Sequence, residues 1–411
     1  MGALCSGGET SEPEQVQRSV VKKNKKQGEI IHFFMLGIEG AGKTTIIRQL
    51  KCLCMQKPLN YQMYDDDWNL VDREKIFDEH ELVGLKNVVR INLVTAAASL
   101  IRKTRDRAAD DVLIGSEAAD AILRKVTELY EGPVDIYDSS NQIDSEFGGY
   151  IIEILSNQEI IRSLEMPIIG LKIEDGTRYF LKDEGRVKNI FNDSYQLTND
   201  DIVHVRKPTV SFKSYKFRIK QLRVEIHDMG GQKSELVKIP QFMSQFLSSS
   251  GHCFLLYVSS LAAFQEPDKD AKGRTVLDKS SAIFRNVLNL DGVDECTIMI
   301  FFNKQDRFEE ICRDTVHNDP DGEQKRQLEK AVGYVPKQKL GGGGKKGKPE
   351  NYDYLKDSIR DRFIGILKNH NEKKSYYMKY TQATDAQLMS TIFYAVENEI
   401  ISAFFTQARF L

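Results

Sequence analysis

The sequence lacks any long apolar run. No stretch approaches the roughly 18 to 20 apolar residues that a helix needs to cross a bilayer. The start of the chain also has no apolar core of the kind found in secretory signals. An excess of charge of one sign is missing too. The formal net charge is −2, so no global basic field indicates a nucleic-acid partner, and we expect none.

Cysteine is scarce, and its placement excludes two common uses. Cys52 and Cys54 have no second pair at ligand spacing, so the sequence predicts neither a zinc site nor a disulfide framework. Cys253 and Cys296 lie inside apolar runs typical of buried strands. This usage fits a reducing cytosol. The chain has 411 residues, of which 41% are hydrophobic, enough for a sizeable core and two or more domains.

Apolar patterning divides the chain into sheet-forming and helical parts. The strand-like runs are 29–36, 210–220, 221–227, 253–258, 296–302 and, more weakly, 376–380. Helical segments separate most of them, which predicts a doubly wound α/β sheet. Between 59 and 204 apolar residues recur at steps of three and four, as in Ala118, Ile122 and Val126. This block is predicted to be a separate all-helical domain inserted between two sheet-forming parts, 29–58 and 205–411.

Three further segments complete the predicted organisation. Residues 1–28 contain a helix from about 12 to 27. The stretch 319–350 is rich in glycine and lysine, and we expect a flexible surface insertion there. A C-terminal helix from Asp385 carries Leu388, Ile392 and Val396 on one face.

The first chemical motif is Gly37-Ile-Glu-Gly-Ala-Gly-Lys43-Thr44, which lies between a predicted strand and a predicted helix. Its glycines let backbone N–H groups point at phosphates, Lys43 reaches the terminal phosphate oxygens, and the Thr44 hydroxyl binds Mg²⁺. The residues predicted to contact nucleotide here are Glu39, Gly40, Ala41, Gly42, Lys43, Thr44 and Thr45. The motif predicts a nucleoside-triphosphate site and leaves the base open.

The base is indicated by Asn303-Lys304-Gln305-Asp306, which follows an apolar strand. The Asp306 carboxylate can accept hydrogen bonds from the ring N–H and the exocyclic amine of guanine, a pair that adenine does not offer. The stem of Lys304 can lie along the purine face. The backbone N–H of Ala383, after the last strand, can meet the guanine carbonyl. These residues predict GTP or GDP as the ligand.

A third motif, Asp228-Met-Gly-Gly-Gln232, ends the predicted hairpin. Asp228 suits a Mg²⁺ ligand that acts through water. Gly231 has no side chain to block its N–H from the γ-phosphate, and Gln232 is placed to orient an attacking water. The sequence therefore predicts GTP hydrolysis with Mg²⁺ as the cofactor.

Together these motifs give the sequence its resemblance to the heterotrimeric G-protein alpha subunits, over nearly its whole length. The helical block fits the helical domain of that family, and the rest fits its Ras-like GTPase domain. Tyr179-Phe-Leu181 and Asp201-Ile-Val-His-Val-Arg206-Lys-Pro-Thr209 resemble the family's approach to the first switch. The resemblance implies that Arg206 is an arginine finger supplied in cis and that Thr209 ligates Mg²⁺.

The resemblance also implies roles for both ends of the chain. Met1-Gly2-Ala3-Leu4-Cys5-Ser6 satisfies the pattern for myristoylation on Gly2, with Cys5 as a second acylation site and basic residues nearby. We expect a peripheral, lipid-anchored protein at the cytoplasmic face of the plasma membrane. The implied partners are a beta-gamma dimer at the N-terminal helix, a seven-helix receptor at the C-terminal helix and tail, an effector, and GTPase-activating regulators.

The chain departs from the family pattern at three places. Gly40 and Ala41 stand where the family has a glutamate and a serine, and that glutamate pairs with the finger arginine. Glu39 is one position away, so we hypothesise a loosened clasp and faster spontaneous GDP release. Leu236, Val237 and Ile239 replace a more basic, tryptophan-containing surface, and Ala408 stands where some members carry a cysteine. These departures predict altered partner binding and assign no signalling class.

Two other interpretations stay open at this point. In the first, the chain is a nucleotide-binding scaffold with weak turnover. In the second, it is an Arf-like GTPase with an unrelated helical insertion. The presence of Arg206, Thr209 and Gln232 argues against the first. The arginine just before Thr209 argues against the second.

Overall fold

The computed structural model describes residues 29–107, 116–165, 173–209, 212–247, 251–317, 322–333 and 353–408. The predicted N-terminal helix and the acylation sites Gly2 and Cys5 lie outside these ranges. So do Val210 and Ser211, and most of the predicted insertion.

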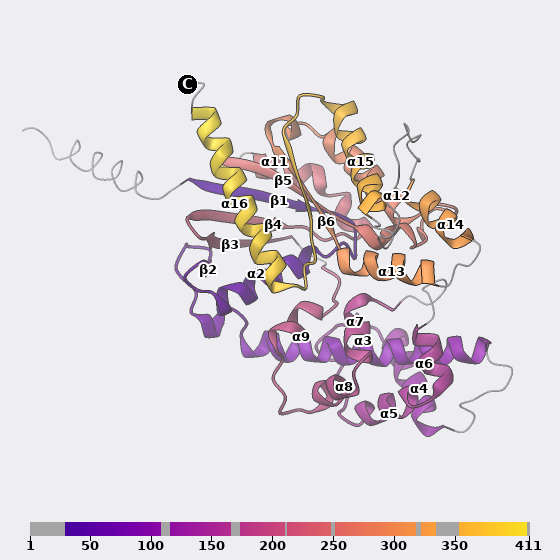
Figure 1. The fold of residues 1–411 in the computed structure, drawn as a ribbon. Helices are drawn as coiled ribbons and strands as arrows, with labels where there is room; N and C mark the ends of the chain where they lie inside the picture. Colours follow the sequence, from indigo (N-terminus) through magenta and orange to yellow (C-terminus); the bar gives the residue numbers. More distant parts are fainter. Residues whose placement is uncertain are drawn as a thin grey trace, which may run out of the picture.

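A seven-stranded sheet forms the larger part of the molecule (Figure 1). The strands are β1 (Ile30–Leu36), β2 (Tyr61–Tyr64), β3 (Lys213–Ile219), β4 (Leu222–Asp228), β5 (His252–Ser260), β6 (Thr297–Asn303) and β7 (Tyr376–Tyr380). Their order is β2-β3-β4-β1-β5-β6-β7. β3 is antiparallel to both β2 and β4, and all the other neighbouring pairs are parallel, so β3 alone runs opposite to the other strands. The doubly wound α/β class predicted from the sequence is confirmed.

Alternation along β1 explains why the sheet is covered on both faces. Ile31, Phe33 and Met35 face one core, which they share with α2 (Lys43–Gln56) and α16 (Ala386–Ala408). Phe34 and Leu36 face a second core, under the helices on the other side of the sheet. Those helices are α11 (Ile239–Leu247), α12 (Val276–Leu288), α13 (Gln305–His317), α14 (Glu323–Val332) and α15 (Asp353–His370). Short turns of helix, α10 (Lys233–Leu236), η2 (Leu261–Phe264) and η3 (Val293–Glu295), connect these layers.

A block of helices lies below the sheet in Figure 1. It contains α3 (Glu79–Arg107), α4 (Glu117–Glu131), α5 (Phe147–Leu155), α6 (Gln158–Glu165), α7 (Asp175–Leu181), α8 (Glu184–Phe191) and α9 (Asn199–His204), preceded by the short turn η1 (Arg73–Lys75). The predicted helical character of 59–204 holds for most of this range. However, β2 falls within it and pairs with β3 at the sheet edge. Four residues without clear alternation give too weak a pattern to be read as a strand.

The predicted insertion at 319–350 needs a correction in its first half. Residues Glu323–Val332 form α14, and Leu328 and Val332 are buried in the second core, 4% and 1% exposed. The segment is rich in charge, but these two apolar residues stand four apart and so share one helical face. The high content of charged residues gave no indication of this helix, which packs against its neighbours.

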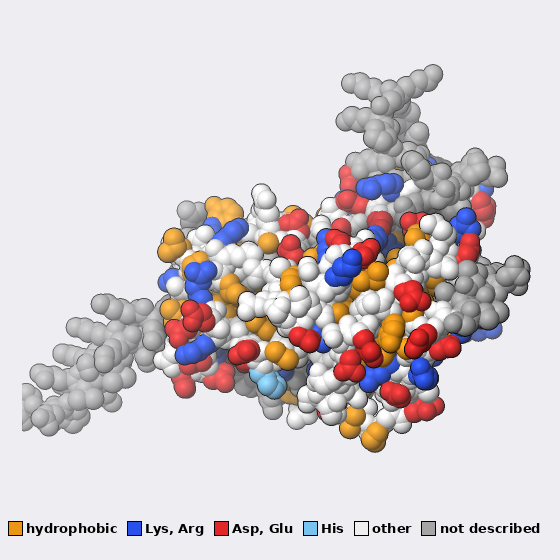
Figure 2. All heavy atoms as spheres, turned by 90° about the horizontal axis from the view of Figure 1, so that it is seen from below, with side chains coloured by type: hydrophobic (Ala, Val, Ile, Leu, Met, Phe, Trp, Pro, Cys, Tyr) orange, Lys and Arg blue, Asp and Glu red, His pale blue; other side chains and the backbone are white. Residues whose placement is uncertain are grey.

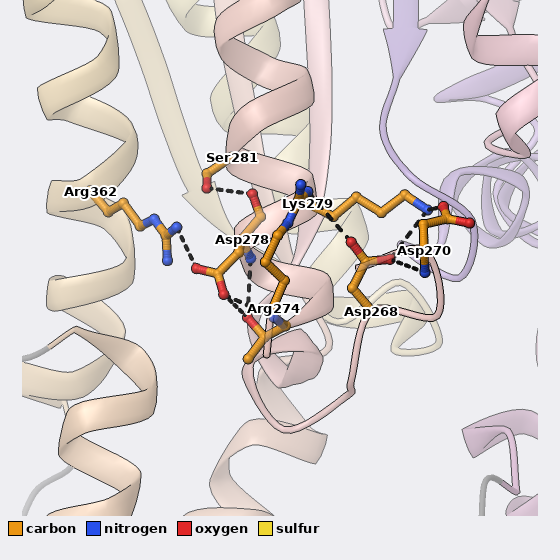
Figure 3. Close-up of polar contacts among 8 residues, drawn as sticks. Asp268, Asp270, Arg274, Asp278, Lys279, Ser281 and Arg362 are labelled. Carbon is orange, nitrogen blue, oxygen red and sulfur yellow. Dashed lines mark hydrogen bonds and ion pairs between the residues drawn. The ribbon is translucent and has the colours of Figure 1, made fainter. Parts of the chain in front are cut away.

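A network of polar contacts fixes the start of α12 (Figure 3). The Thr275 hydroxyl accepts from the backbone N–H of Asp278, and the Asp278 carboxylate accepts from the Thr275 N–H, which forms a capping box. Arg362 on α15 donates to Asp278 Oδ1 over 2.6 Å. The buried Asp268 lies 3.4 Å from Arg274 Nη2 and 3.7 Å from Lys279 Nζ. These contacts join the loop before α12 to α12 and α15.

Within the described ranges, no helix is both long and apolar enough to cross a membrane. Figure 2 shows the helical block from below, where acidic and basic side chains are interspersed. No basic field gathers on that face.

Candidate nucleotide-binding site

A cleft opens where the carboxyl ends of β1, β4 and β6 meet the helical block. This is the edge at which doubly wound sheets bind ligands. Its lining includes all but one of the predicted nucleotide contacts. The residues that it brings together are Glu39, Gly40, Gly42, Lys43, Thr44, Thr45, Arg206, Thr209, Gly231, Gln232, Asn303, Lys304, Asp306 and Ala383. The exception, Ala41, is buried behind the loop.

The loop after β1 can adopt its shape only with glycine at two positions. Gly37 has φ +148°, and a Cβ there would lie 2.3 Å from the Val258 carbonyl oxygen. Gly42 has φ +101°, and a Cβ there would lie 2.1 Å from Asn303 Nδ2. Gly42 also precedes the first turn of α2, so the free N–H groups of that helix point into the cleft. The loop can therefore wrap around an anion.

Lys43 is buried at the base of this loop. Its Nζ donates to the carbonyl oxygens of Gly37, over 2.7 Å, and Ile38, over 3.2 Å. Burial lowers its pKa to about 8, and the nearby Asp228 carboxylate opposes this shift. A phosphate in the cleft would add negative charge beside this ammonium and restore its preference for the charged form.

Three oxygen-bearing side chains meet beside Lys43. The hydroxyls of Thr44 and Thr209 are 2.6 Å apart, and Thr44 Oγ1 donates to Asp228 Oδ2 over 3.4 Å. Burial raises the pKa of Asp228 to about 6, with Lys43 opposing the shift. Among the described atoms, Asp228 Oδ1 is buried and has no hydrogen-bond partner. Hard oxygen ligands with an unsatisfied buried carboxylate oxygen are the donor set that Mg²⁺ requires, so these residues fit the predicted metal.

The loop after β4 lies directly against the loop after β1. Gly231 accepts a hydrogen bond from the Glu39 N–H over 3.0 Å. A Cβ on Gly231 would lie 2.4 Å from Glu39 N and 2.7 Å from Lys43 Nζ, so no larger residue fits this contact. Gln232 is the N-cap residue of α10 and lines the cleft.

Arg206 spans the mouth of the cleft, and its contacts contradict the predicted loosened clasp. Its Nη2 donates to Glu39 Oε1 over 2.8 Å, and its Nε lies 3.7 Å from Glu174 Oε2 of the helical block. In the sequence, Glu39 stands one position before the glutamate that pairs with the finger arginine in the family, which predicts a loosened clasp. In the structure Glu39 makes that pair from its own position, beside the turn at Gly40, where φ is +79°. The clasp is closed.

The main chain around Arg206 is held from both sides. The Arg48 guanidinium on α2 donates to the Val205 carbonyl oxygen. Asn92 on α3 donates from Nδ2 to the Arg206 carbonyl oxygen over 2.7 Å, and accepts from the Tyr137 hydroxyl over 2.8 Å. The sheet domain therefore holds Val205 and the helical block holds Arg206.

Asn303 ties the phosphate loop to the loop after β7. Its Nδ2 donates to the Ala41 carbonyl oxygen over 2.9 Å, and its Oδ1 accepts from Thr381 Oγ1, over 3.1 Å, and from the Ala383 N–H, over 3.0 Å. The sequence predicts that the Ala383 N–H contacts the guanine carbonyl. In the structure this N–H donates to Asn303 instead. Asp306 is exposed and lines the same cleft.

Sequence reasoning missed the residues of the helical block that close the cleft. Asp175, at the start of α7, accepts from Lys304 Nζ over 2.7 Å, and Arg307 Nε lies 3.5 Å away. Burial acts to raise the pKa of Asp175, but the charges of Lys304 and Arg307 outweigh it and lower that pKa. No motif surrounds Asp175, so no local signal marked it. The amine of Lys304, predicted only to contribute its stem, binds the two domains together.

The fold and this cleft define a P-loop nucleotide-binding protein with a helical domain closing over its site. Comparison with known proteins narrows the class. The family model of the G-protein alpha subunit matches residues 10–400, so the chain belongs to the G-protein alpha subunit family. Because the match includes the helical block, it excludes the interpretation as an Arf-like protein with an unrelated insertion. Membership supports guanine-nucleotide-binding signalling as the general function.

Its relatives are distant. A guanine nucleotide-binding protein subunit alpha of Cryptococcus neoformans is 23% identical over 410 residues, 97% of this chain and 78% of the relative. The alpha-17 subunit of Caenorhabditis elegans is 23% identical over 414 residues, 97% of this chain and 96% of the relative. The alpha-7 subunit of Dictyostelium discoideum is 20% identical over 303 residues, 74% of this chain and 68% of the relative.

Proposed function

We propose that this chain is a signalling switch that binds GDP and GTP, hydrolyses GTP with Mg²⁺, and relays signals from a membrane receptor to an effector. The observation that carries the proposal is the shared cleft. It brings the phosphate loop, Arg206, Thr209, Gln232 and Asp306 together from segments far apart in sequence.

The residues around Asp228 would hold the metal. Thr44 and Thr209 supply hydroxyl oxygens, and the Asp228 carboxylate acts through water. When bound, Mg²⁺ would neutralise charge on the phosphate oxygens. Side chains of the protein would supply the other contributions to hydrolysis and to recognition of the base.

Those side chains divide the work of hydrolysis. Lys43, at the base of the loop, carries positive charge to the terminal phosphates. The Arg206 guanidinium, at the mouth, is placed to stabilise the negative charge that develops in the transition state. Gln232 orients the attacking water from the loop after β4. Asp306 selects guanine by pairing with its two N–H donors.

The same contacts supply a switch. A γ-phosphate that attracts the Thr209 hydroxyl and the Gly231 N–H would draw both flanking loops onto the nucleotide, and hydrolysis would release them. Gly231 already contacts the phosphate loop. The movement would therefore be a local repositioning of a docked segment.

The partner surfaces of this switch are also proposals. Val237, at the turn between α10 and α11, is 76% exposed, whereas Ile239, the first residue of α11, is buried. Of these two apolar substitutions, Val237 therefore alters the surface offered to an effector or a beta-gamma dimer, and Ile239 does not. Acylation at Gly2 and Cys5 would hold the protein at the cytoplasmic face of the plasma membrane. Affinity capture in GDP and in GTPγS tests whether a beta-gamma dimer leaves on activation.

Single-turnover GTP hydrolysis tests the central proposal. We expect Gln232→Leu and Arg206→Cys each to slow hydrolysis by at least about tenfold while GTP still binds. A wild-type protein that binds GTP without turnover would instead identify a nucleotide-binding scaffold. Rates unchanged in both variants would contradict the assignment of the catalytic pair.

A further inference from the structure

Two histidines and a glutamate gather on the sheet face beneath α11, outside the nucleotide cleft. His32 on β1 stands opposite Glu225 on β4, and His227 follows Glu225 by two residues. Residues two apart on a strand point to the same face. One ligand atom from each of the three side chains lies within 4.8 Å of the others.

The geometry of the cluster is that of a site and not of a simple ion pair. His32 Nδ1 lies 3.6 Å from Glu225 Oε2, and the two imidazole rings are stacked with centroids 5.9 Å apart. His227 Nε2 is buried and has no hydrogen-bond partner among the atoms that the structure describes. A buried nitrogen without a partner destabilises a fold unless something else binds it.

A neighbouring strand fixes the orientation of His227. Its Nδ1 and Ser214 Oγ form a hydrogen bond of 2.7 Å, and Ser214 is the β3 residue directly opposite His227. The tautomer that donates from Nδ1 leaves the lone pair of Nε2 directed at the cluster. Metal-binding histidines are usually held in this way by a partner on their other nitrogen.

Aromatic rings enclose the histidines. Phe246 of α11 presents its ring edge-on to both imidazoles, at 6.5 Å from His32 and 5.6 Å from His227. Phe212 stacks on His227 at 5.7 Å. The Glu225 side chain is 17% exposed, so the cluster retains a route to solvent on one side.

We propose that His32, Glu225 and His227 form a binding site for a divalent transition-metal ion, with Zn²⁺ as the best match. Two imidazoles and one carboxylate are a known zinc donor set, and water can take the fourth position. Zinc–ligand bonds of about 2.0 to 2.2 Å place tetrahedral ligand atoms about 3.4 Å apart. The His32–Glu225 distance of 3.6 Å is already close to this spacing, and all three ligand atoms lie within 4.8 Å of one another.

This site is distinct from the predicted Mg²⁺ site. His227 and Asp228 are consecutive in β4, so their side chains point to opposite faces of the strand. The donor sets differ as well, since imidazole suits zinc and hydroxyl or carboxylate oxygens suit magnesium. An ion here would join β1 to β4 beneath α11, the second helix after Gln232.

The test is a titration of the full chain, loaded with GDP and a large excess of Mg²⁺, with Zn²⁺ in a calorimeter. We expect one equivalent to bind with a dissociation constant in the micromolar range or below. His32→Gln and His227→Gln should each weaken binding at least about tenfold, and Ser214→Ala about tenfold through loss of the orienting hydrogen bond. The matched control is His252→Gln, which removes a half-exposed histidine 3.6 Å from Glu29 Oε2 and should leave binding unchanged.

Two further measurements keep the proposal testable if a histidine variant fails to retain GDP. Glu225→Gln alters a ligand that is 17% exposed and should weaken Zn²⁺ binding while GDP binding persists. His227→Cys should keep the site and give bound Co²⁺ a thiolate charge-transfer band. Absence of a stoichiometric Zn²⁺ isotherm would overturn the proposal. So would equal affinity in wild type and both His→Gln variants, or an equal loss in His252→Gln.

Discussion

Replacing Glu39 with glutamine removes one charge from the clasp over the nucleotide cleft and keeps the shape of the side chain. The carboxylate accepts from Arg206 Nη2 over 2.8 Å, and the same guanidinium also lies 3.7 Å from Glu174. The variant therefore weakens one of two ion pairs that join the phosphate loop, Arg206 and the helical block. We expect faster release of GDP.

The exposure of the pair sets the size of the effect. Arg206 is 22% exposed and Glu39 48% exposed, so water screens their attraction, and an ion pair of this kind contributes about 0.2–1 kcal/mol. At about 1.4 kcal/mol for each factor of ten, release should accelerate by roughly 1.5- to 5-fold. A hundredfold acceleration of release would require an ion pair fully buried from water, and the exposed fractions of Arg206 and Glu39 exclude this.

The assay follows release of a fluorescent GDP analogue after addition of excess GTP, at low and at high salt. The acceleration should shrink as salt rises, because screening weakens the pair in the wild type. Glu323→Gln is the matched control, since Glu323 pairs with Arg326 over 3.0 Å on α14, away from the cleft. Unchanged release at low salt would refute the reasoning. So would an acceleration of the same size in an Arg206→Gln background, where no pair remains to be broken.

Three other predictions test the base, the phosphate loop and the corrected fold. Asp306→Asn should weaken GTP binding and shift preference towards a xanthine nucleotide; retained GTP selectivity in a competition assay would contradict the assignment of the base. Lys43 has its pKa lowered to about 8 in the nucleotide-free protein, and phosphate favours its charged form, so GDP binding above pH 8 should take up a proton. Calorimetry in two buffers of different ionisation enthalpy measures this uptake, and Lys43→Arg should abolish it. Leu328→Ala should lower the free energy of unfolding by about 2–4 kcal/mol in urea titrations, because α14 buries this side chain; a loss below about 0.5 kcal/mol would show that α14 does not pack as described.

Local patterns were sufficient to predict the strands that carry the site. Continuous apolar runs predicted β1, β5 and β6, since parallel strands covered on both faces are apolar throughout. The phosphate loop and the Asn303 to Asp306 segment each place their chemistry within a few residues of one strand end. Such sites depend on short-range geometry, so a single sequence reveals them.

Other features depend on contacts between distant segments. The Lys304–Asp175 pair joins residues 129 positions apart, and nothing in the residues around Asp175 indicates it. Glu39 and Arg206 stand 167 positions apart, so counting positions along the phosphate loop alone cannot tell whether their side chains meet. β2 exists because β3 offers it an edge, and four residues carry no pattern of their own.

In the proposed GTPase cycle, the two hydrogen bonds that hold the chain around Arg206 would constrain when hydrolysis and nucleotide exchange occur. Val205 is bound to the sheet domain through Arg48, and Arg206 to the helical block through Asn92. If the helical block moves away to let nucleotide leave, it pulls the main chain of Arg206 away from the phosphates. An open molecule would then be unable to hydrolyse, and a molecule able to hydrolyse would be closed to exchange. Hydrolysis and nucleotide exchange would then exclude one another at any given moment.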